Sequence, residues 1–189
     1  LGIPGEDYFD GKGVAFCSIC DAQVFKGKDV AVVGGGNAGL EAVIDLLPYA
    51  QKIYLLHRGD TLKGDAVTQE KIRTHPNVTV ILQATPREIF GEGFVSGLRY
   101  ADAKGALQQL NVQGVFVEIG SNSNSDMVKD LVVLDERSEI VVDHKTQRSS
   151  VSGVWAAGDV CDVLYKQNNI AAGDAIKAVL NIHEYLQKK

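Results

Sequence analysis

Between residues 29 and 47 an apolar run, a group of glycines and an amphipathic run follow one another. Residues 29–33 read DVAVV, which predicts a buried strand, and glycines follow at 34, 36 and 39. Apolar residues then recur at 40, 43, 44 and 47, the spacing of one helical face. Strand, glycine turn and helix form the context in which a G-x-G-x-x-G pattern predicts dinucleotide binding.

Each glycine of this pattern has a physical reason to be there. Gly34 would make the tight turn, Gly36 would let a pyrophosphate approach the backbone, and Gly39 would let the helix pack close to the strand. The start of the helix would then offer free N–H groups and a positive dipole end to the phosphates. The alternative is a glycine-rich loop that binds nothing.

The composition narrows the class of protein. The chain has 189 residues, of which 45% are hydrophobic, so it can bury a sizeable core in one domain or two small ones. A net charge of -5 argues against a nucleic-acid partner. No apolar run is long enough to span a membrane, and no basic start leads into an apolar stretch. We therefore expect a cytoplasmic protein with neither a nucleic-acid nor a membrane partner.

Further strands and helices extend the first unit. Residues 52–56 and 78–82 predict two more strands, and residues 65–75 predict a helix with Asp65 as its N-cap. Prolines at 48 and 76 would end the helices that precede them. The order β-α-β-α-β predicts a Rossmann-like, doubly wound parallel sheet, so the fold class is α/β.

After residue 85 the sequence pattern changes from alternating strands and helices to short successive strands. Residues 88–90, 95–100 and 107–112 predict an antiparallel meander, and residues 114–119 predict another strand. Residues 121–125 form a polar loop, which we interpret as a domain crossover or hinge. Two more strands are expected at 139–142 and 153–157. A last helix is expected at 169–186, with Ala172, Ile176, Val179 and Leu180 on one face.

Two residues separate Cys17 from Cys20, the Cys-x-x-Cys spacing of redox-active pairs, and Asp21 follows directly. Such a pair can open and close reversibly and often carries one thiol of lowered pKa. The Asp21 carboxyl could deliver or take a proton there. The alternatives are half of a zinc site, which would need two more ligands, or two buried thiols. Cys161 and four scattered histidines form no second pair, and we expect Cys161 to be a packed thiol.

Two basic side chains follow the second strand, where dinucleotide folds read the adenosine ribose. An NAD site would carry Asp or Glu there, but this chain has His57 and Arg58. Arg accepts a phosphate with two parallel hydrogen bonds, and Lys63 could add a second positive charge. This pattern favours NADPH, with NADH as the alternative, and the structural alternative is a solvated Arg at a strand end.

A second polar group follows the strand expected at 153–157. Gly158 and Asp159 close that strand, and the Asp159 carboxylate could hydrogen-bond sugar or ribityl hydroxyls. The start of the last helix, near Gln167, could stabilise negative charge on a flavin ring. Gly-Asp turns are common, so these residues alone predict little.

Taken together, these pieces resemble a family. The chain is similar to the bacterial low-molecular-weight thioredoxin reductases and to the flavoprotein subunit of alkyl hydroperoxide reductase. The matching segments occur in the family's order and cover essentially the whole chain: residues 1–6 (LGIPGE), 13–21 (GVAFCSICD), 32–37 (VVGGGN), 56–58 (LHR), 114–120 (GVFVEIG), 153–160 (GVWAAGDV), 165–167 (YKQ) and 171–174 (AAGD).

The resemblance implies an electron path from NADPH to FAD, then to the Cys17–Cys20 disulfide, and then to a disulfide of thioredoxin or a similar dithiol protein. It implies that Cys20 faces the flavin, that Cys17 attacks the partner and that Asp21 is the acid–base group. The implied cofactor contacts are Gly34, Gly36, Asn37, Gly39, His57, Arg58 and Lys63 for the nicotinamide nucleotide, and Gly158, Asp159 and Gln167 for FAD. Family members are usually homodimers.

Departures from the family pattern define further expectations. The family begins with a strand and a separate glycine motif for FAD, well before the segment that matches Leu1. We therefore expect this chain to lack the N-terminal half of the FAD domain and to bind FAD poorly by itself. The expected division is an NAD(P)H-binding domain with the Cys-x-x-Cys at 13–119, and a partial FAD-binding domain at 1–12 and 120–189.

The basic motif also departs from the family. The usual His-Arg-Arg-Asp-x-x-Arg is HRGDTLK at residues 57–63, and residues 120–125 replace the usual Pro-Asn-Thr segment. The branch that serves peroxidases prefers NADH and lacks the basic pair. Two alternatives therefore stay open: part of an NADH-dependent peroxiredoxin reductase, or an NAD(P)-binding module or redox sensor without turnover.

Overall fold

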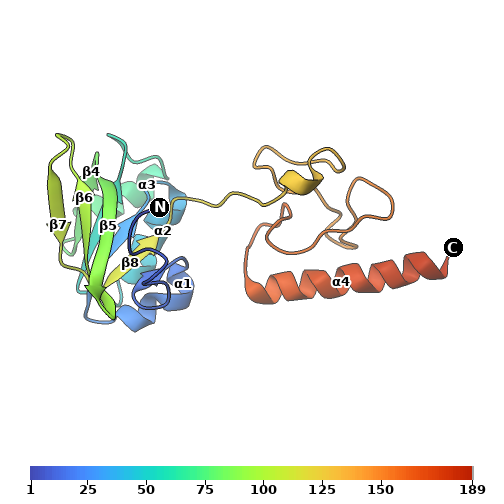
Figure 1. Cartoon of the computed structure of the whole chain (residues 1–189), viewed down its shortest axis with the longest axis horizontal. Helices are drawn as coiled ribbons and strands as arrows, with labels where there is room; N and C mark the ends of the chain where they lie inside the picture. The colour runs from blue at the N-terminus through green and yellow to red at the C-terminus, as the bar shows by residue number, and fades with distance from the viewer. Residues whose placement is uncertain (189) are drawn as a thin grey trace. The chain divides into compact units, whose positions relative to one another are not determined.

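The structure is a computed structural model that describes residues 1–188. The chain divides into two compact units, Leu1–Gly120 and Ser121–Lys189, which we call the N-terminal unit and the C-terminal unit (Figure 1). All the described strands and three of the α-helices belong to the N-terminal unit, and each unit is described here by itself.

A five-stranded parallel sheet is the centre of the N-terminal unit. Its strands are β1 (Val14–Ala15), β8 (Gly114–Val117), β2 (Asp29–Val33), β3 (Lys52–His57) and β4 (Val78–Leu82), in that spatial order. Helix α2 (Asn37–Leu46) connects β2 to β3, and α3 (Ala66–Thr74) connects β3 to β4. The predicted β-α-β-α-β order is therefore confirmed.

Alternate residues of β2 face opposite sides of this sheet. Val30 and Val32 belong to a buried cluster that also includes Leu40 and Val43 of α2, whereas Ala31 and Val33 belong to a second cluster. A parallel sheet is buried on both faces, which explains why β2 is a continuous apolar run. The unit therefore has a core on each side of the sheet.

The second cluster is closed by a three-stranded antiparallel sheet. Its strands are β5 (Thr85–Glu92), β6 (Phe94–Ala101) and β7 (Leu107–Leu110), which pair in that order. Ile89 and Leu98 from this sheet are buried with Val115 of β8. Figure 1 shows the antiparallel strands on the opposite side of the unit from α1 and α2. The predicted meander is confirmed.

The N-terminal segment packs on the same core. Leu1, Ile3 and Phe9 lie against the second cluster, and the terminal ammonium donates to the Glu6 carboxylate at 2.8 Å. Residues 1–12 thus pack within the N-terminal unit, although the family resemblance assigns them to the FAD-binding part. Two short helices follow β1: α1 (Ser18–Asp21) and the 3-10 helix η1 (Ala22–Phe25).

The described part of the C-terminal unit contains the 3-10 helix η2 (Asp126–Val128) and α4 (Asn168–Gln187). The strands predicted at 139–142 and 153–157 are wrong. Ile140 makes single bridges to Leu134 and Cys161, and Trp155 makes one to Arg148. A strand needs successive paired residues, and the described residues here supply only isolated bridges. A small buried cluster of Val132, Ile140, Val142 and Cys161 holds the unit together.

Helix α4 has the predicted extent but packs with a different face. Ile176, Val179 and Leu180 are more than 60% exposed, while Asp174 and Ala178 are buried. The carboxylate of Asp174 accepts a hydrogen bond from the buried Gln147 amide at 3.0 Å. The face of α4 that packs within the unit is therefore the one that carries Asp174 and Ala178, and the predicted apolar face is exposed. Among residues 1–188, no helix is both long and apolar enough to cross a membrane.

Candidate dithiol and dinucleotide site

The loop between β2 and α2 needs glycine at two of its three motif positions. Gly34 has φ +138°, and a Cβ there would overlap the carbonyl of Glu118. A Cβ at Gly39 would overlap the carbonyl of Gly34, so α2 can approach the loop only without a side chain. A Cβ at Gly36 would meet nothing within 4 Å. The loop therefore leaves open space at Gly36, as a pyrophosphate would require.

A pocket of about 540 Å³ opens at this loop. It lies where β2, β3 and β8 end, and the carboxyl ends of parallel strands are where such folds bind ligands. Gly36 gives α2 no side-chain cap, so the first N–H groups of α2 receive no side-chain acceptor from it. The pocket is lined by Leu1, Ile3, Val33, Gly34, Gly35, Gly36, Asn37, Ala38, Leu56, His57, Arg58, Lys63, Ala84, Thr85, Pro86, Glu118, Ile119 and Gly120.

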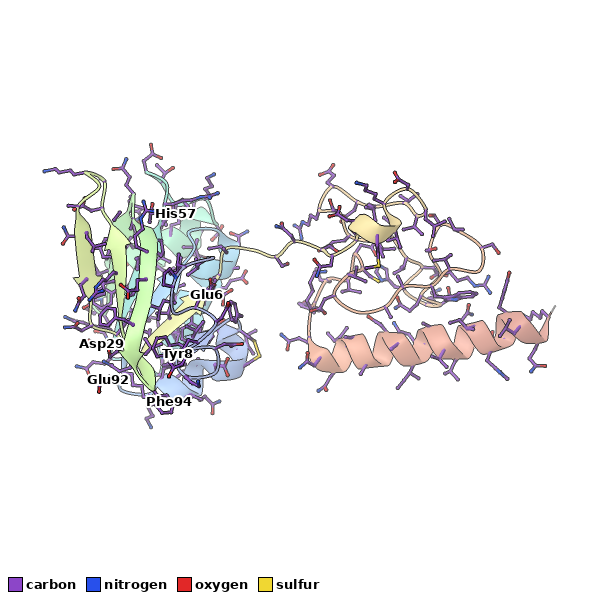
Figure 2. All side chains as sticks on the ribbon, viewed as in Figure 1. Glu6, Tyr8, Asp29, His57, Glu92 and Phe94 are labelled. Atoms are coloured by element: carbon purple, nitrogen blue, oxygen red, sulfur yellow. A yellow bond between two sulfur atoms is a disulfide. The ribbon has the colours of Figure 1, made fainter. Side chains whose placement is uncertain are left out.

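His57 lines the pocket, with its ring close to Gly35 and Gly59, where any Cβ would overlap it (His57 is labelled in Figure 2). Burial lowers the pKa of His57, and the cations of Lys63 and Arg58 lower it further. Its Nε2 is buried and has no hydrogen-bond partner among the described residues. The neutral ring leaves Arg58 and Lys63, both exposed, as the positively charged side chains of the pocket.

Asn37 has a structural contact of its own. Its side-chain oxygen accepts a hydrogen bond from the Asp65 backbone N–H at 2.8 Å. Asp65 in turn caps α3 by accepting from the Thr68 N–H at 2.8 Å, which confirms it as the predicted N-cap. Asn37 therefore ties the glycine loop to the start of α3.

Cys17 and Cys20 form a disulfide, with their Cα atoms 5.3 Å apart. This finding favours the redox interpretation over half of a zinc site. Cys17 is the N-cap of α1, and its Sγ accepts a hydrogen bond from the Cys20 N–H at 3.2 Å. Cys20 is exposed, whereas Cys17 and Asp21 are half-buried. Asp21 ends α1, one residue after Cys20.

Ser18, between the two cysteines, joins the dithiol segment to α2. Its Oγ donates to the Asp45 carboxylate of α2 at 2.8 Å. Burial raises the pKa of Glu118 to about 7; the Ser18 N–H opposes this shift, and the carboxylates of Asp45 and Glu41 add to it. The sequence analysis missed Ser18 and Glu118. An acidic residue at the end of a parallel strand was the available signal.

The remaining predicted residues belong to the C-terminal unit. Gly158 is buried with φ +80°, and the Asp159 side chain is exposed. Gln167 is the N-cap residue of α4 and makes no side-chain cap. The structure places these three near the turn that leads to α4, while the other predicted site residues lie in the N-terminal unit.

Lys166 makes the polar contacts that hold this turn. The sequence analysis did not predict this role. Its Nζ donates to the carbonyls of Asp159 and Cys161 at 2.7 and 2.9 Å and pairs with the Glu139 carboxylate at 2.9 Å. Cys161 is buried, as predicted. Burial and the nearby Asp162 and Asp174 carboxylates raise the pKa of its thiol to about 11, so it stays protonated.

Comparison with curated proteins identifies relatives of greater length. The chain is 46% identical over 188 residues to the F subunit of alkyl hydroperoxide reductase in Pseudomonas putida, and the match covers 98% of this chain and 36% of that protein. The F subunit of the Staphylococcus aureus (strain MRSA252) enzyme is 44% identical over 187 residues, covering 98% of this chain and 37% of that protein. The chain thus spans about a third of these relatives.

Solved structures agree in fold. Thioredoxin reductase from Streptococcus pyogenes MGAS5005 is 33% identical, with a TM-score of 0.92 over 100% of this chain and 62% of that one. Thioredoxin reductase from Giardia duodenalis is 34% identical, with a TM-score of 0.86 over 99% of this chain and 62% of that one. The family model described as pyridine nucleotide-disulphide oxidoreductase matches residues 1–175. With the glycine loop and the disulfide in one unit, this chain belongs to the pyridine nucleotide-disulphide oxidoreductase family.

Proposed function

We propose that the chain is the nicotinamide-nucleotide and dithiol part of a flavoprotein that reduces protein disulfides. Electrons pass from NADPH through FAD to Cys17–Cys20, and then to a disulfide of thioredoxin or a similar dithiol protein. The observation that carries the proposal is the presence, in one compact unit, of the Cys17–Cys20 disulfide and the pocket at Gly34 to Gly39. The family implies both flavin and nicotinamide cofactors.

In the complete protein we assign residues 13–119 to the NAD(P)H-binding domain, and residues 1–12 and 120–189 to the FAD-binding domain. Because the chain spans about a third of the curated relatives, the activity belongs to the complete protein. We expect that protein to be a cytoplasmic homodimer. Bound FAD would supply two-electron transfer between the nicotinamide and the disulfide. Gly158, Asp159 and Gln167 would contact it.

The residues of the dithiol have separate tasks. Two electrons break the S–S bond, leaving a thiolate at one cysteine and, after uptake of one proton, a thiol at the other. Cys17 then attacks the partner's disulfide, and Cys20 displaces the partner as a dithiol while Cys17–Cys20 re-forms. Asp21, adjacent to Cys20, holds the proton that the leaving sulfur of the partner needs.

A second candidate rests on the high identity to the F subunit of alkyl hydroperoxide reductase. In this version the partner is a peroxiredoxin-type disulfide protein and the reductant is NADH. A third version, a nucleotide-binding redox sensor without turnover, predicts binding without electron transfer. Reduction assays separate these candidates: the complete flavoprotein is given NADPH or NADH, and reduction of thioredoxin and of a peroxiredoxin is followed.

The nucleotide preference is tested with Arg58→Ala. We expect NADPH affinity to fall by about 1–3 kcal/mol, roughly 5- to 150-fold, because a charge-assisted contact to the 2′-phosphate is lost. NADH affinity should stay nearly unchanged. Lys71→Ala, which removes an exposed charge from the last turn of α3, is the matched control. An equal loss for both nucleotides would contradict the role of Arg58.

A direct titration tests binding itself. We expect the purified chain to bind NADPH, detected by nucleotide fluorescence, and to show no flavin absorbance. If neither nucleotide binds, the loop at Gly34 to Gly39 is only a packing turn. Flavin colour in the isolated chain would show that residues 1–12 and 120–189 suffice to hold FAD.

A further inference from the structure

The segment between β3 and α3, residues 58–65, carries the positively charged side chains of the pocket, Arg58 and Lys63. We call this segment the basic loop. Both side chains are exposed. A lysine carries its charge on a flexible stem, so the position of its backbone decides which region the charge can reach. The contacts that hold the backbone of the basic loop therefore matter for what the pocket binds.

Two hydrogen bonds join the basic loop to the glycine loop. The Lys63 N–H donates to the Gly35 carbonyl at 2.7 Å. The Asp65 N–H donates to the side-chain oxygen of Asn37 at 2.8 Å. Gly64, between the two donors, leaves no room for a side chain, because a Cβ there would overlap a buried leucine of α2. The backbone of Lys63 is therefore held directly against the loop that we assign to the pyrophosphate.

Gln69 holds the basic loop from the side of α3. Its half-buried side-chain amide donates to the Gly64 carbonyl at 2.7 Å and to the Leu62 carbonyl at 3.4 Å. A glutamine amide has two N–H donors on one nitrogen, so a single side chain can bind two carbonyls. The Leu62 side chain is buried in the cluster that includes α2. Lys63 thus lies between two residues whose carbonyls are bound by the same amide group.

We propose that Gln69 is a positioning residue that sets the preference of the pocket for a nucleotide with an additional phosphate on its adenosine ribose. Gln69 holds the backbone of Lys63 so that the Lys63 ammonium reaches that phosphate. Gln69 is not among the described residues that line the pocket, so it acts through Lys63 and not by contact with the ligand. The inference rests on the proposed function, which assigns Lys63 to the nucleotide.

The first test uses two probes that differ by this one phosphate, NADPH and NADH, titrated by nucleotide fluorescence. Gln69→Met keeps an unbranched side chain of similar length but removes the amide. We expect NADPH affinity to fall by about threefold to tenfold, because the hydrogen bonds that fix Lys63 are lost. NADH affinity should change by less than about twofold. Gln51→Met, the same substitution at an exposed position before β3, should leave both affinities unchanged. Equal losses for the two nucleotides in Gln69→Met would overturn the inference, since general loosening of the pocket acts on both.

A double-mutant cycle tests whether Gln69 acts through Lys63. Lys63→Met alone should lower NADPH affinity, because the charge is removed. Adding Gln69→Met to Lys63→Met should then lower it no further, since two residues that act as one unit are not additive. If the two losses multiply, Gln69 does not act through Lys63 and the inference is overturned.

Amide hydrogen exchange of the chain without nucleotide tests the positioning by itself. In Gln69→Met the Lys63 and Asp65 amides should exchange at least about threefold faster, while the amides of β2 should keep their rates. Unchanged exchange at Lys63, together with normal NADPH binding by the unmodified chain, would overturn the role of Gln69 alone. Failure of the unmodified chain to bind either nucleotide would overturn the proposed function and the phosphate preference with it, whereas the exchange rates would still decide whether Gln69 holds the loop.

Discussion

The two units of this chain use their apolar residues differently. The N-terminal unit buries them in two clusters, one on each face of its parallel sheet. The C-terminal unit has one small cluster around Ile140 and Cys161, and the apolar side chains of Ile176, Val179 and Leu180 are exposed on α4. A regular sheet lets a unit bury both of its faces, whereas loops joined by isolated bridges cannot do so. The comparison predicts that the two units differ in stability and respond to substitution independently.

The strongest test of this comparison removes a core side chain from the N-terminal unit. Phe116, on β8 of the parallel sheet, is fully buried and packs against Phe25, with the two ring centroids 5.0 Å apart. Phe116→Ala should lower the free energy of unfolding of this unit by about 3–5 kcal/mol. Far-UV circular dichroism during denaturation should report the loss.

Trp155 provides the control within the same molecule. It is the single tryptophan of the chain and belongs to the C-terminal unit, so its fluorescence follows that unit alone. The fluorescence transition should stay where it is in the unmodified chain. Equal shifts of both transitions would show that the units unfold together and would break the comparison.

A pair of glycine substitutions separates folding from binding within the N-terminal unit. Gly39→Ala should cost about 1–3 kcal/mol of stability, because the new methyl overlaps the Gly34 carbonyl. Gly36→Ala meets no neighbour, so its stability should change by less than about 1 kcal/mol. Its nucleotide affinity should nevertheless fall. Thermal unfolding and nucleotide titration of both variants provide the measurements, and normal NADPH affinity in Gly36→Ala would contradict the pyrophosphate role of this loop.

Lys166 offers the corresponding test in the C-terminal unit. Lys166→Met keeps much of the side-chain volume but removes the contacts to Glu139 and to two carbonyls. Because a buried carboxylate then loses its partner, the C-terminal unit should lose about 1–3 kcal/mol. Trp155 fluorescence should report this change. Lys188→Met, at the exposed end of α4, is the control, and equal effects of the two substitutions would contradict the proposed role of Lys166 in the turn.

The smallest expected effect is a pH dependence of stability in the N-terminal unit. Since the pKa of Glu118 is raised to about 7 in the folded state, ionising this group costs stability as the pH rises from its ordinary value toward 7. Glu118→Gln should therefore be more stable than the unmodified chain at about pH 8, by roughly 1 kcal/mol once solvent screening is allowed for. At about pH 4 the two should be equal, because both side chains are then neutral. Chemical denaturation at the two pH values measures this difference, and a stability advantage that is the same at both would contradict it.

Local patterns in the sequence were sufficient for the N-terminal unit. The apolar run at 29–33, the helical spacing from Leu40 and the cap at Asp65 each agree with the structure because propensity and burial favour the same element there. The apolar runs at 139–142 and 153–157 met the same criterion and did not form strands. Pairing depends on a partner distant in sequence, which a local pattern does not contain.

Only the residues of the site that belong to local sequence motifs could be predicted. Gly34, Gly39 and the Cys17–Cys20 pair follow from spacing. The hydrogen bond of Ser18 with Asp45 joins residues 27 positions apart, so no local spacing could show it. Lys166 was visible only as part of a motif, because its role depends on Glu139 in a distant loop.

The attachment of Ser18 to Asp45 of α2 has a consequence for the kinetics of the dithiol. Opening the disulfide would normally free the intervening residues to sample many conformations. With the Ser18 hydroxyl held by Asp45, the two sulfurs keep a high effective concentration with respect to each other. A mixed disulfide formed at one cysteine would therefore be resolved rapidly by the other, which shortens the lifetime of any covalent complex with a partner.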